Sequence, residues 1–515
     1  MEHNATWRSF LAGKRWERIR VTLLSTVLFG LVSQGIGMFN QLSCGDDIVT
    51  LSGAATSVSS DRWMLHILER LETVFFMDGQ FSLPLFHGLF SILCIAAAAC
   101  LLVDLLRIRR QILCAGLGCF MVSFPVVTAW FGYMSIMPCY ALSMLMMVAG
   151  ACLICRKNVW WMKLTGILLC GCSVGIFQAS VSLLVSVLLL YDLACLSERE
   201  EKLSIMIKRL TVQAVCITGA IAFCLVMNRF FLEKSHMEMT AYMGLDQLKS
   251  TPILTYLKRA GRAYREFFLP ARNVSTDMYP MHSYYLYLAM LCSNLAMGIG
   301  QIKKLGKNNP DRALLLALFL GLTPLGSNFI YVVSDQVNGL MTYGQIAPAV
   351  LFVWLADRTV FHNKAFQKIA SGLTAGILGL SCVMYARYDN QCYLKITFQQ
   401  EQAISYYTTL TARIKSVEGY WDDIPVAFLN GEKIEDDTIY NINELDFIQL
   451  QPYGETLQSY LNAHADGAFL ARWCGFAPHY VDAAAYEGLP EIQDMPRYPD
   501  DGSIRNLGDV IVVNF

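Results

Sequence analysis

The chain of 515 residues is 55% hydrophobic and only 16% charged, with a mean hydropathy of +0.41. Soluble proteins carry about 25% charged residues, so this composition excludes an ordinary soluble enzyme and indicates a membrane protein. The formal net charge of −1 hides an uneven distribution, because residues 395–515 hold 19 acidic and 7 basic side chains. We therefore expect a basic membrane domain, residues 1–394, followed by a small acidic α/β domain outside the membrane, residues 395–515.

Eleven apolar segments in the first domain are predicted to cross the membrane as helices. A span needs about 20 mostly apolar residues, and the fifth, sixth and tenth segments are shorter than that. The fifth and sixth are separated only at Gly175–Gln178. The predicted spans are residues 21–39, 83–106, 112–131, 136–155, 164–176, 180–196, 210–231, 283–299, 313–333, 340–355 and 369–385.

Clusters of Lys and Arg between the spans predict the orientation. With eleven spans, every cluster falls on the side of the N-terminus, whereas joining the fifth and sixth spans would move the later clusters to the opposite side. Because basic loops stay inside, we expect a multi-pass plasma-membrane protein with a cytoplasmic N-terminus and an extracytoplasmic C-terminal domain. The clusters lie at residues 14–20, 107–110, 156–163, 199–209, 303–312 and 358–368.

The first outer loop carries an acidic pair, Asp46 and Asp47, within the sequence CGDD. Gly45 permits a tight turn that can direct a carboxylate toward the membrane interface. A carboxylate in that place could serve as the general base for a hydroxyl acceptor, or hold a divalent cation. The alternative is a solvated acidic loop or a helix N-cap, and spacing alone favours that alternative.

The same loop continues with SSDRWMLHILERLETVFF, which predicts an amphipathic helix at the membrane interface. For the apolar stripe itself, an ordinary helix packed on the bundle is the favoured interpretation. Arg62 precedes the stripe and could orient a carboxylate or contact a phosphate. The apolar positions recur every fourth residue, at Trp63, Ile67, Leu71 and Phe75.

The fourth outer loop contains a basic segment, YLKRAGRAYREFFLPAR, in which Arg259, Arg262 and Arg265 follow helical spacing. This pattern fits a specific phosphate site and, with equal weight, general attraction to anionic lipid headgroups. Nucleic acid is a poor partner for a segment predicted to lie outside the cell. The sequence also contains no P-loop, dinucleotide-binding motif or nucleophile elbow, which argues against a nucleotide-driven enzyme.

Three motifs in this topology resemble the GtrII-type membrane glucosyltransferases, which have GT-C architecture. They are GDD at Gly45–Asp47, DRW at Asp61–Trp63 and LMTYGQIAP at Leu340–Pro348, and the similar span pattern covers roughly residues 15–390. In the expected family pattern, glycine stands at the position that Asp61 occupies in this chain. The resemblance implies a GT-C-like helical membrane protein that transfers a hexose, with glucose favoured. The donor would be a polyprenyl-phosphate sugar and the acceptor a hydroxyl of an extracytoplasmic glycan or cell-surface polymer, with inversion at the anomeric carbon.

No cofactor is expected for this reaction, although the acidic pair leaves room for a divalent cation. A transporter or flippase of lipid-linked sugars is the main alternative, and a scaffold protein would leave GDD unexplained. The resemblance also implies roles for particular residues. The expected general base is Asp46 or Asp47. The donor phosphate is expected to contact Arg259, Arg262 and Arg265, and the other expected substrate contacts are Arg62, Trp63 and Tyr343.

Overall fold

The computed structural model describes ten stretches of the chain, and Asp46 and Asp47 lie outside them. The described residues form two compact units. The first ends at Asn390, and the second contains Leu42 and continues from Gln391 to the C-terminus. The described stretches are residues 13–42, 56–76, 82–156, 159–198, 202–238, 252–270, 282–361, 363–430, 443–453 and 466–515.

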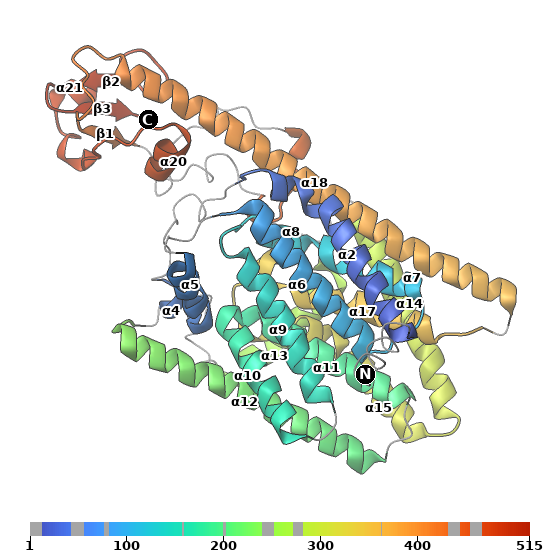
Figure 1. The fold of residues 1–515 in the computed structure, drawn as a ribbon. Coiled ribbons are helices and arrows are strands. Elements are labelled where there is room, and N and C mark those ends of the chain that lie inside the picture. Colours follow the sequence, from blue (N-terminus) through green and yellow to red (C-terminus); the bar gives the residue numbers. More distant parts are fainter. Residues whose placement is uncertain are drawn as a thin grey trace, which may run out of the picture. The chain divides into compact units, whose positions relative to one another are not determined.

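The described part of the first unit is built from helices (Figure 1). Uniformly apolar stretches favour helices in a membrane, because a helix satisfies its own backbone hydrogen bonds. Proline lies in the first turn of α6, α8, α9, α15 and α17, where its missing N–H costs nothing. The α-helices are α2 (Lys14–Phe39), α4 (Thr56–Ser59), α5 (Trp63–Phe76), α6 (Pro84–Leu105), α7 (Gln111–Ser123), α8 (Pro125–Phe131), α9 (Met137–Cys155), α10 (Trp160–Ile176), α11 (Val181–Glu198), α12 (Leu203–Ser235), α13 (Ile253–Phe268), α14 (Ser283–Gly306), α15 (Pro310–Ser327), α16 (Ile330–Val333), α17 (Ala347–Arg358) and α18 (Lys364–Lys415), which continues into the second unit.

The helices support a membrane protein but do not confirm eleven crossings. Among the described residues, seven helices are long and apolar enough to span a membrane, or eight if α7 and α8, bent by 42°, form one span. The predicted span 313–333 divides into α15 and α16. The predicted span 340–355 becomes two 3-10 turns, η5 (Gly339–Met341) and η6 (Tyr343–Ile346), followed by α17.

The predicted interruption between the fifth and sixth spans is present. Helix α10 ends at Ile176, the backbone of Phe177 is extended, and the 3-10 turn η1 (Gln178–Ser180) leads into α11. Glycine lets α9 and α10 approach closely: a Cβ at Gly150 on α9 would lie 2.9 Å from the carbonyl oxygen of Gly166 on α10. The interruption itself is packed into the helical unit, since Phe177 is 5% and Ala179 is 4% exposed.

The second unit contains a three-stranded sheet in the order β1-β3-β2. Strand β1 (Val426–Leu429) pairs in parallel with β3 (Ile511–Asn514), which pairs antiparallel with β2 (Ile504–Asn506). The sheet and the short helices fit the small α/β domain that the sequence predicted. The remaining elements are η8 (Asn443–Leu445), α20 (Asp466–Trp473), η9 (Ala483–Ala485) and α21 (Pro490–Gln493). That this unit lies outside the membrane stays a prediction.

Candidate active site

The DRW motif forms the turn between α4 and α5. Asp61 has a φ of 65°, in the left-handed region that glycine adopts freely and Asp tolerates better than most residues. The backbone N–H of Arg62 donates to the carbonyl oxygen of Ser57, at 2.9 Å, and closes the turn. Glycine would therefore adopt this backbone conformation without strain, and Asp is one of the residues that tolerate it.

The interruption between α10 and α11 holds this turn. The Gln178 side chain donates from Nε2 to the carbonyl oxygens of Ser60, at 2.9 Å, and Asp61, at 3.0 Å. The neighbouring Phe177 ring lies 5.9 Å from the guanidinium carbon of Arg62, within the range of a cation–π contact. Two features that the sequence suggested separately, the DRW motif and the broken helix, therefore form one local structure.

Trp63 anchors α5 to the bundle. Its side chain is 2% exposed, stacks on Phe231 at 6.0 Å between ring centroids and meets Phe223 edge-on at 5.7 Å. Only glycine fits opposite the indole, since a Cβ at Gly175 would lie 2.4 Å from Nε1. This packing supports a positioning role, and the expected contact between Trp63 and a substrate stays a prediction.

Glu69 on α5 is a buried carboxyl group that the sequence did not single out as a site residue. It is 3% exposed, and Ser57 Oγ donates to its Oε2 at 2.9 Å. Burial raises the pKa of Glu69 to about 7, although the hydrogen bond from Ser57 and the charge of Arg62 oppose the rise. A carboxyl group with a pKa near neutrality suits proton transfer. Periodicity could not single it out, because Glu69 lies about 120° from Trp63 around the helix, outside the apolar stripe of α5.

A row of aromatic rings connects the DRW turn with the LMTYGQIAP segment. From Phe177, the row continues to Tyr140 at 4.6 Å between centroids, then to Trp130 at 6.2 Å. Trp130 stacks on Tyr343 at 4.9 Å with an interplanar angle of 27°. The cavity bordered by these rings measures about 10 Å³, too small for a sugar, so the row acts as packing between two predicted motifs.

Tyr343 is buried, with 5% of its surface exposed. Its hydroxyl donates to the carbonyl oxygen of Met121 at 2.9 Å, and Trp130 Nε1 donates to the carbonyl oxygen of Leu340 at 3.0 Å. The next residue, Gly344, has no room for a side chain, since a Cβ would lie 2.4 Å from the carbonyl oxygen of Ser327. These contacts fix the segment tightly, and the expected contact of Tyr343 with substrate stays a prediction.

The three predicted arginines of α13 differ in their surroundings. Arg259 is 6% exposed and pairs with the carboxylate of Asp335. Arg262 Nη1 donates to the backbone carbonyl oxygen of the same Asp335, at 2.9 Å. Arg265 has a side chain that is 63% exposed and pairs with Glu266 at 2.5 Å. The structure thus brings Arg259 and Arg262 together at Asp335, just before the LMTYGQIAP segment, and leaves Arg265 apart.

The first turns of α13 expose an apolar face. Ile253 is 82% exposed, Leu254 60% and Leu257 67%, whereas Arg259 and Glu266 face the protein. An amphipathic helix with this distribution can lay its apolar face in the lipid interface. Arg259 and Arg262 then lie between the exposed apolar side chains of α13 and Asp335, which both of them contact.

A second buried carboxyl group, Asp389 on α18, was also missed. It is fully buried, and its Oδ2 accepts hydrogen bonds from Ser33 and, at 3.3 Å, from Gln34 on α2. Its Oδ1 has no hydrogen-bond partner among the described residues. The predicted span ended at Tyr385, which placed Asp389 just beyond the last span, whereas α18 continues without a break.

The described residues contain no group of three or more His, Cys, Asp and Glu side chains that could hold a metal ion. Asp46 and Asp47 are not among those residues, so a divalent cation at the acidic pair stays a prediction. The candidate site therefore consists of the DRW turn, the aromatic row and the α13 arginines, with the acidic pair outside the described part of the chain.

Comparison with known protein families identifies a family for this chain. The family model described as "Glucosyl transferase GtrII" matches residues 35–354, more than half of the chain. This range contains every predicted site residue, from the acidic pair to Tyr343. Neither a curated protein nor a solved structure shows a significant match.

Proposed function

The chain belongs to the GtrII glucosyltransferase family, and we propose that it transfers glucose from a polyprenyl-phosphate donor to a hydroxyl group of an extracytoplasmic glycan. Membership makes it a membrane glucosyltransferase, and the donor, the acceptor and the mechanism belong to the proposal. The observation that carries it is the family match, which spans both long predicted outer loops and all of the candidate residues.

In the proposed reaction, Asp46 or Asp47 accepts the proton of the acceptor hydroxyl as its oxygen attacks the anomeric carbon. The bond between that carbon and the phosphate oxygen breaks, and polyprenyl phosphate departs with the electron pair. Inversion follows from a single displacement. The departing phosphate is a stable anion, so the reaction needs a base and positive charge more than it needs an acid.

The α13 arginines would supply that positive charge. Arg259 and Arg262 lie beside the exposed apolar face of α13, which supports a donor site at the boundary between lipid and water. Arg259 already pairs with Asp335, so a donor phosphate would share the guanidinium group or displace the carboxylate. Arg265, the most exposed of the three, can meet an incoming phosphate first.

The decisive experiment is a transfer assay with the purified full chain and a panel of polyprenyl-phosphate sugars. The double variant Asp46→Asn, Asp47→Asn should lose transfer while retaining its expression and thermal stability. Asp422→Asn with Asp423→Asn is a matched control, because these adjacent acidic residues are exposed in the second unit. Full activity in the first variant would refute the catalytic assignment. Movement of the lipid-linked sugar across the membrane without transfer would favour the flippase instead.

The proposed orientation has a separate test. Cysteine introduced at Ser43 should react with an impermeant thiol reagent added outside the cell, in a background where the neighbouring Cys44 and the exposed Cys292 are replaced. Labelling only from the cytoplasmic side would overturn the proposed topology and with it the outer location of the acidic pair.

A further inference from the structure

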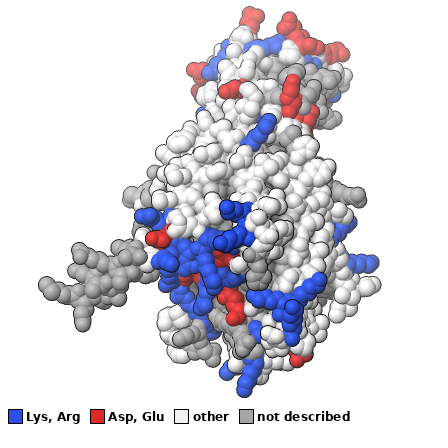
Figure 2. All heavy atoms as spheres, turned by 90° about the vertical axis from the view of Figure 1, so that its right-hand side faces the viewer, with Lys and Arg blue, Asp and Glu red and all other residues white. Residues whose placement is uncertain are grey.

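A large basic cavity lies among the helix ends of the first unit, away from the predicted site residues. Its volume is about 1630 Å³, and nine basic but only two acidic side chains line it. Figure 2 shows Lys and Arg side chains gathered in a patch with few acidic neighbours. Four of the basic clusters that the topology assigned to one side contribute to the lining. The basic residues are Lys14, Arg15, Arg18, Arg107, Arg109, Arg156, Lys163, Lys208 and Arg209.

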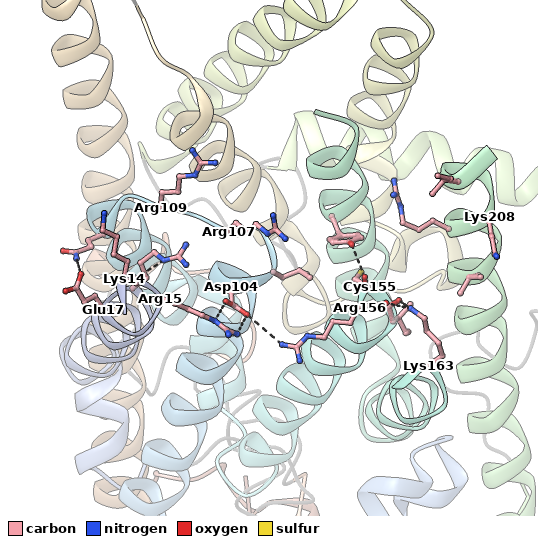
Figure 3. A pocket seen from close by; sticks show the side chains of 18 residues that line it. Lys14, Arg15, Glu17, Asp104, Arg107, Arg109, Cys155, Arg156, Lys163 and Lys208 are labelled. Carbon is pink, nitrogen blue, oxygen red and sulfur yellow. Dashed lines mark hydrogen bonds and ion pairs between the residues drawn. The ribbon is translucent and has the colours of Figure 1, made fainter. Parts of the chain in front are cut away.

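Part of this charge is balanced within the protein. Asp104 binds Arg15 at 2.7 Å and lies 4.0 Å from Arg156, and Figure 3 shows these two arginines meeting at its carboxylate. Arg209 donates to the buried carboxylate of Asp192 at 2.7 Å. These ion pairs leave the lining strongly positive.

Other cations of the lining have no such partner in the described part of the chain. The side chains of Lys14, Arg107, Arg109 and Lys208 make no hydrogen bond or ion pair with any described residue. They come from three places in the sequence, the start of α2, the turn after α6, and α12. Like charges repel in a shared concavity, so this arrangement is most stable with an anion bound.

The turn that presents Arg107 and Arg109 is held rigidly. Arg107 has a φ of 52°, a left-handed conformation that is costly for a residue with a Cβ. The buried carboxylate of Asp357 accepts the backbone N–H groups of Arg109 and Arg110, each at 2.9 Å. Arg358 Nη2 donates to the carbonyl oxygen of Arg107 at 3.2 Å. Membrane orientation requires only basic loops, so it does not account for a turn fixed in this way.

We propose that this cavity binds a phosphoryl anion, either a lipid headgroup or a soluble phosphate. Arginine matches phosphate oxygens with paired N–H donors, and several cations in one cavity can neutralise a phosphate or diphosphate. Apolar side chains complete the wall on the α12 side, where Ile205 is 52% exposed, which suits a headgroup that enters from the membrane. The inference does not depend on the proposed transferase reaction, because its site shares no residue with it.

The test measures binding to the purified full chain in nanodiscs of neutral phosphatidylcholine. One arm titrates inorganic pyrophosphate by calorimetry, and the other counts retained phosphatidylglycerol by native mass spectrometry. Arg107→Gln with Arg109→Gln should weaken binding about 30-fold, because each basic residue near an anionic surface contributes about a fivefold factor. Lys303→Gln with Lys304→Gln is the matched control, since this pair is also basic and exposed but does not line the cavity.

Binding of pyrophosphate would show that the cavity accepts a soluble phosphate. Retention of phosphatidylglycerol without binding of pyrophosphate would show that it is a lipid site. Either result supports the proposal. Absence of both ligands from the wild type, or equal losses in the two double variants, would overturn it. If the arginine variant does not fold, Lys14→Gln with Lys208→Gln removes two other cations of the same lining and provides the same comparison.

Discussion

Gln178 donates two hydrogen bonds to the turn that contains Asp61, one of them to the Asp61 carbonyl oxygen at 3.0 Å. The two residues lie far apart in the sequence, yet the broken end of α10 fixes the backbone of the DRW motif through them. The position of the Arg62 guanidinium beside Phe177 follows from the same arrangement. A substitution of Gln178 should therefore alter the position of the DRW motif, although no residue of the motif is replaced.

We expect Gln178→Ala to lower the rate of sugar transfer about tenfold, because two hydrogen bonds of about 1 kcal/mol each position the DRW turn. The measurement is kcat/KM with the purified enzyme, alongside its thermal unfolding. Thr165→Ala removes an exposed hydroxyl of the preceding helix α10, which bonds only within that helix, and should leave both quantities unchanged. An unaltered rate in Gln178→Ala would show that the turn holds its position without this side chain.

Asp61→Gly should retain activity and stability, whereas Asp61→Val should be destabilised. Glycine adopts a φ of 65° without strain, while a β-branched residue there costs about 1–2 kcal/mol. Replacement by glycine also removes a carboxyl group whose pKa is raised by burial. Thermal unfolding of both variants in the same detergent compares them. Equal stability of the valine and glycine variants would mean that the turn relaxes to another conformation.

The sequence predicted the local features of this site better than their partners. Helical periodicity and the basic clusters predicted α5, α13 and the interruption at Gly175–Gln178, and the family resemblance is confirmed by the match over residues 35–354. Periodicity shows that α13 has a basic and an apolar face, but it cannot show which face meets the protein. In the structure Arg259 is buried, because a carboxylate far along the chain, Asp335, compensates its charge.

Span lengths were less predictable for a related reason. Hydropathy measures how apolar a segment is, whereas a helix continues as long as its backbone hydrogen bonds do. Thus α18 extends far beyond the predicted end at Tyr385 and buries Asp389, while the predicted crossing 340–355 begins as 3-10 turns. Buried polar groups such as Asp389 depend on neighbours from other helices, which a single sequence does not reveal.

Arg259→Ala should raise the KM for the donor about tenfold or more, if its guanidinium binds the donor phosphate as proposed. Asp335→Ala separates this role from a structural one, since Arg259 also pairs with Asp335. If Arg259 binds the donor phosphate, Asp335→Ala only removes a carboxylate that competes with that phosphate for the guanidinium group. The KM for the donor should then stay the same or fall. Matching losses of activity in the two variants would indicate that the ion pair serves only to hold the segment before Tyr343.

Glu69 predicts a pH dependence of stability. Its pKa is about 7 in the folded protein, against an ordinary value of 4.5, so the folded state holds its proton more tightly than the unfolded state. Stability is therefore lost as pH rises from about 4.5 through 7, by a total of about 3 kcal/mol. Glu69→Gln cannot ionise and keeps an acceptor for Ser57, so its advantage in thermal unfolding temperature over the wild type should grow across this range and level off above it.

The matched control is Glu238→Gln, because Glu238 is an exposed carboxylate in the same chain and pays no comparable cost of desolvation. Its unfolding temperature should follow that of the wild type at every pH. A constant difference between Glu69→Gln and the wild type from pH 5 to 8 would mean that Glu69 ionises at its ordinary pKa. In that case the carboxyl group is hydrated in the working protein, and its burial against Ser57 is not maintained in solution.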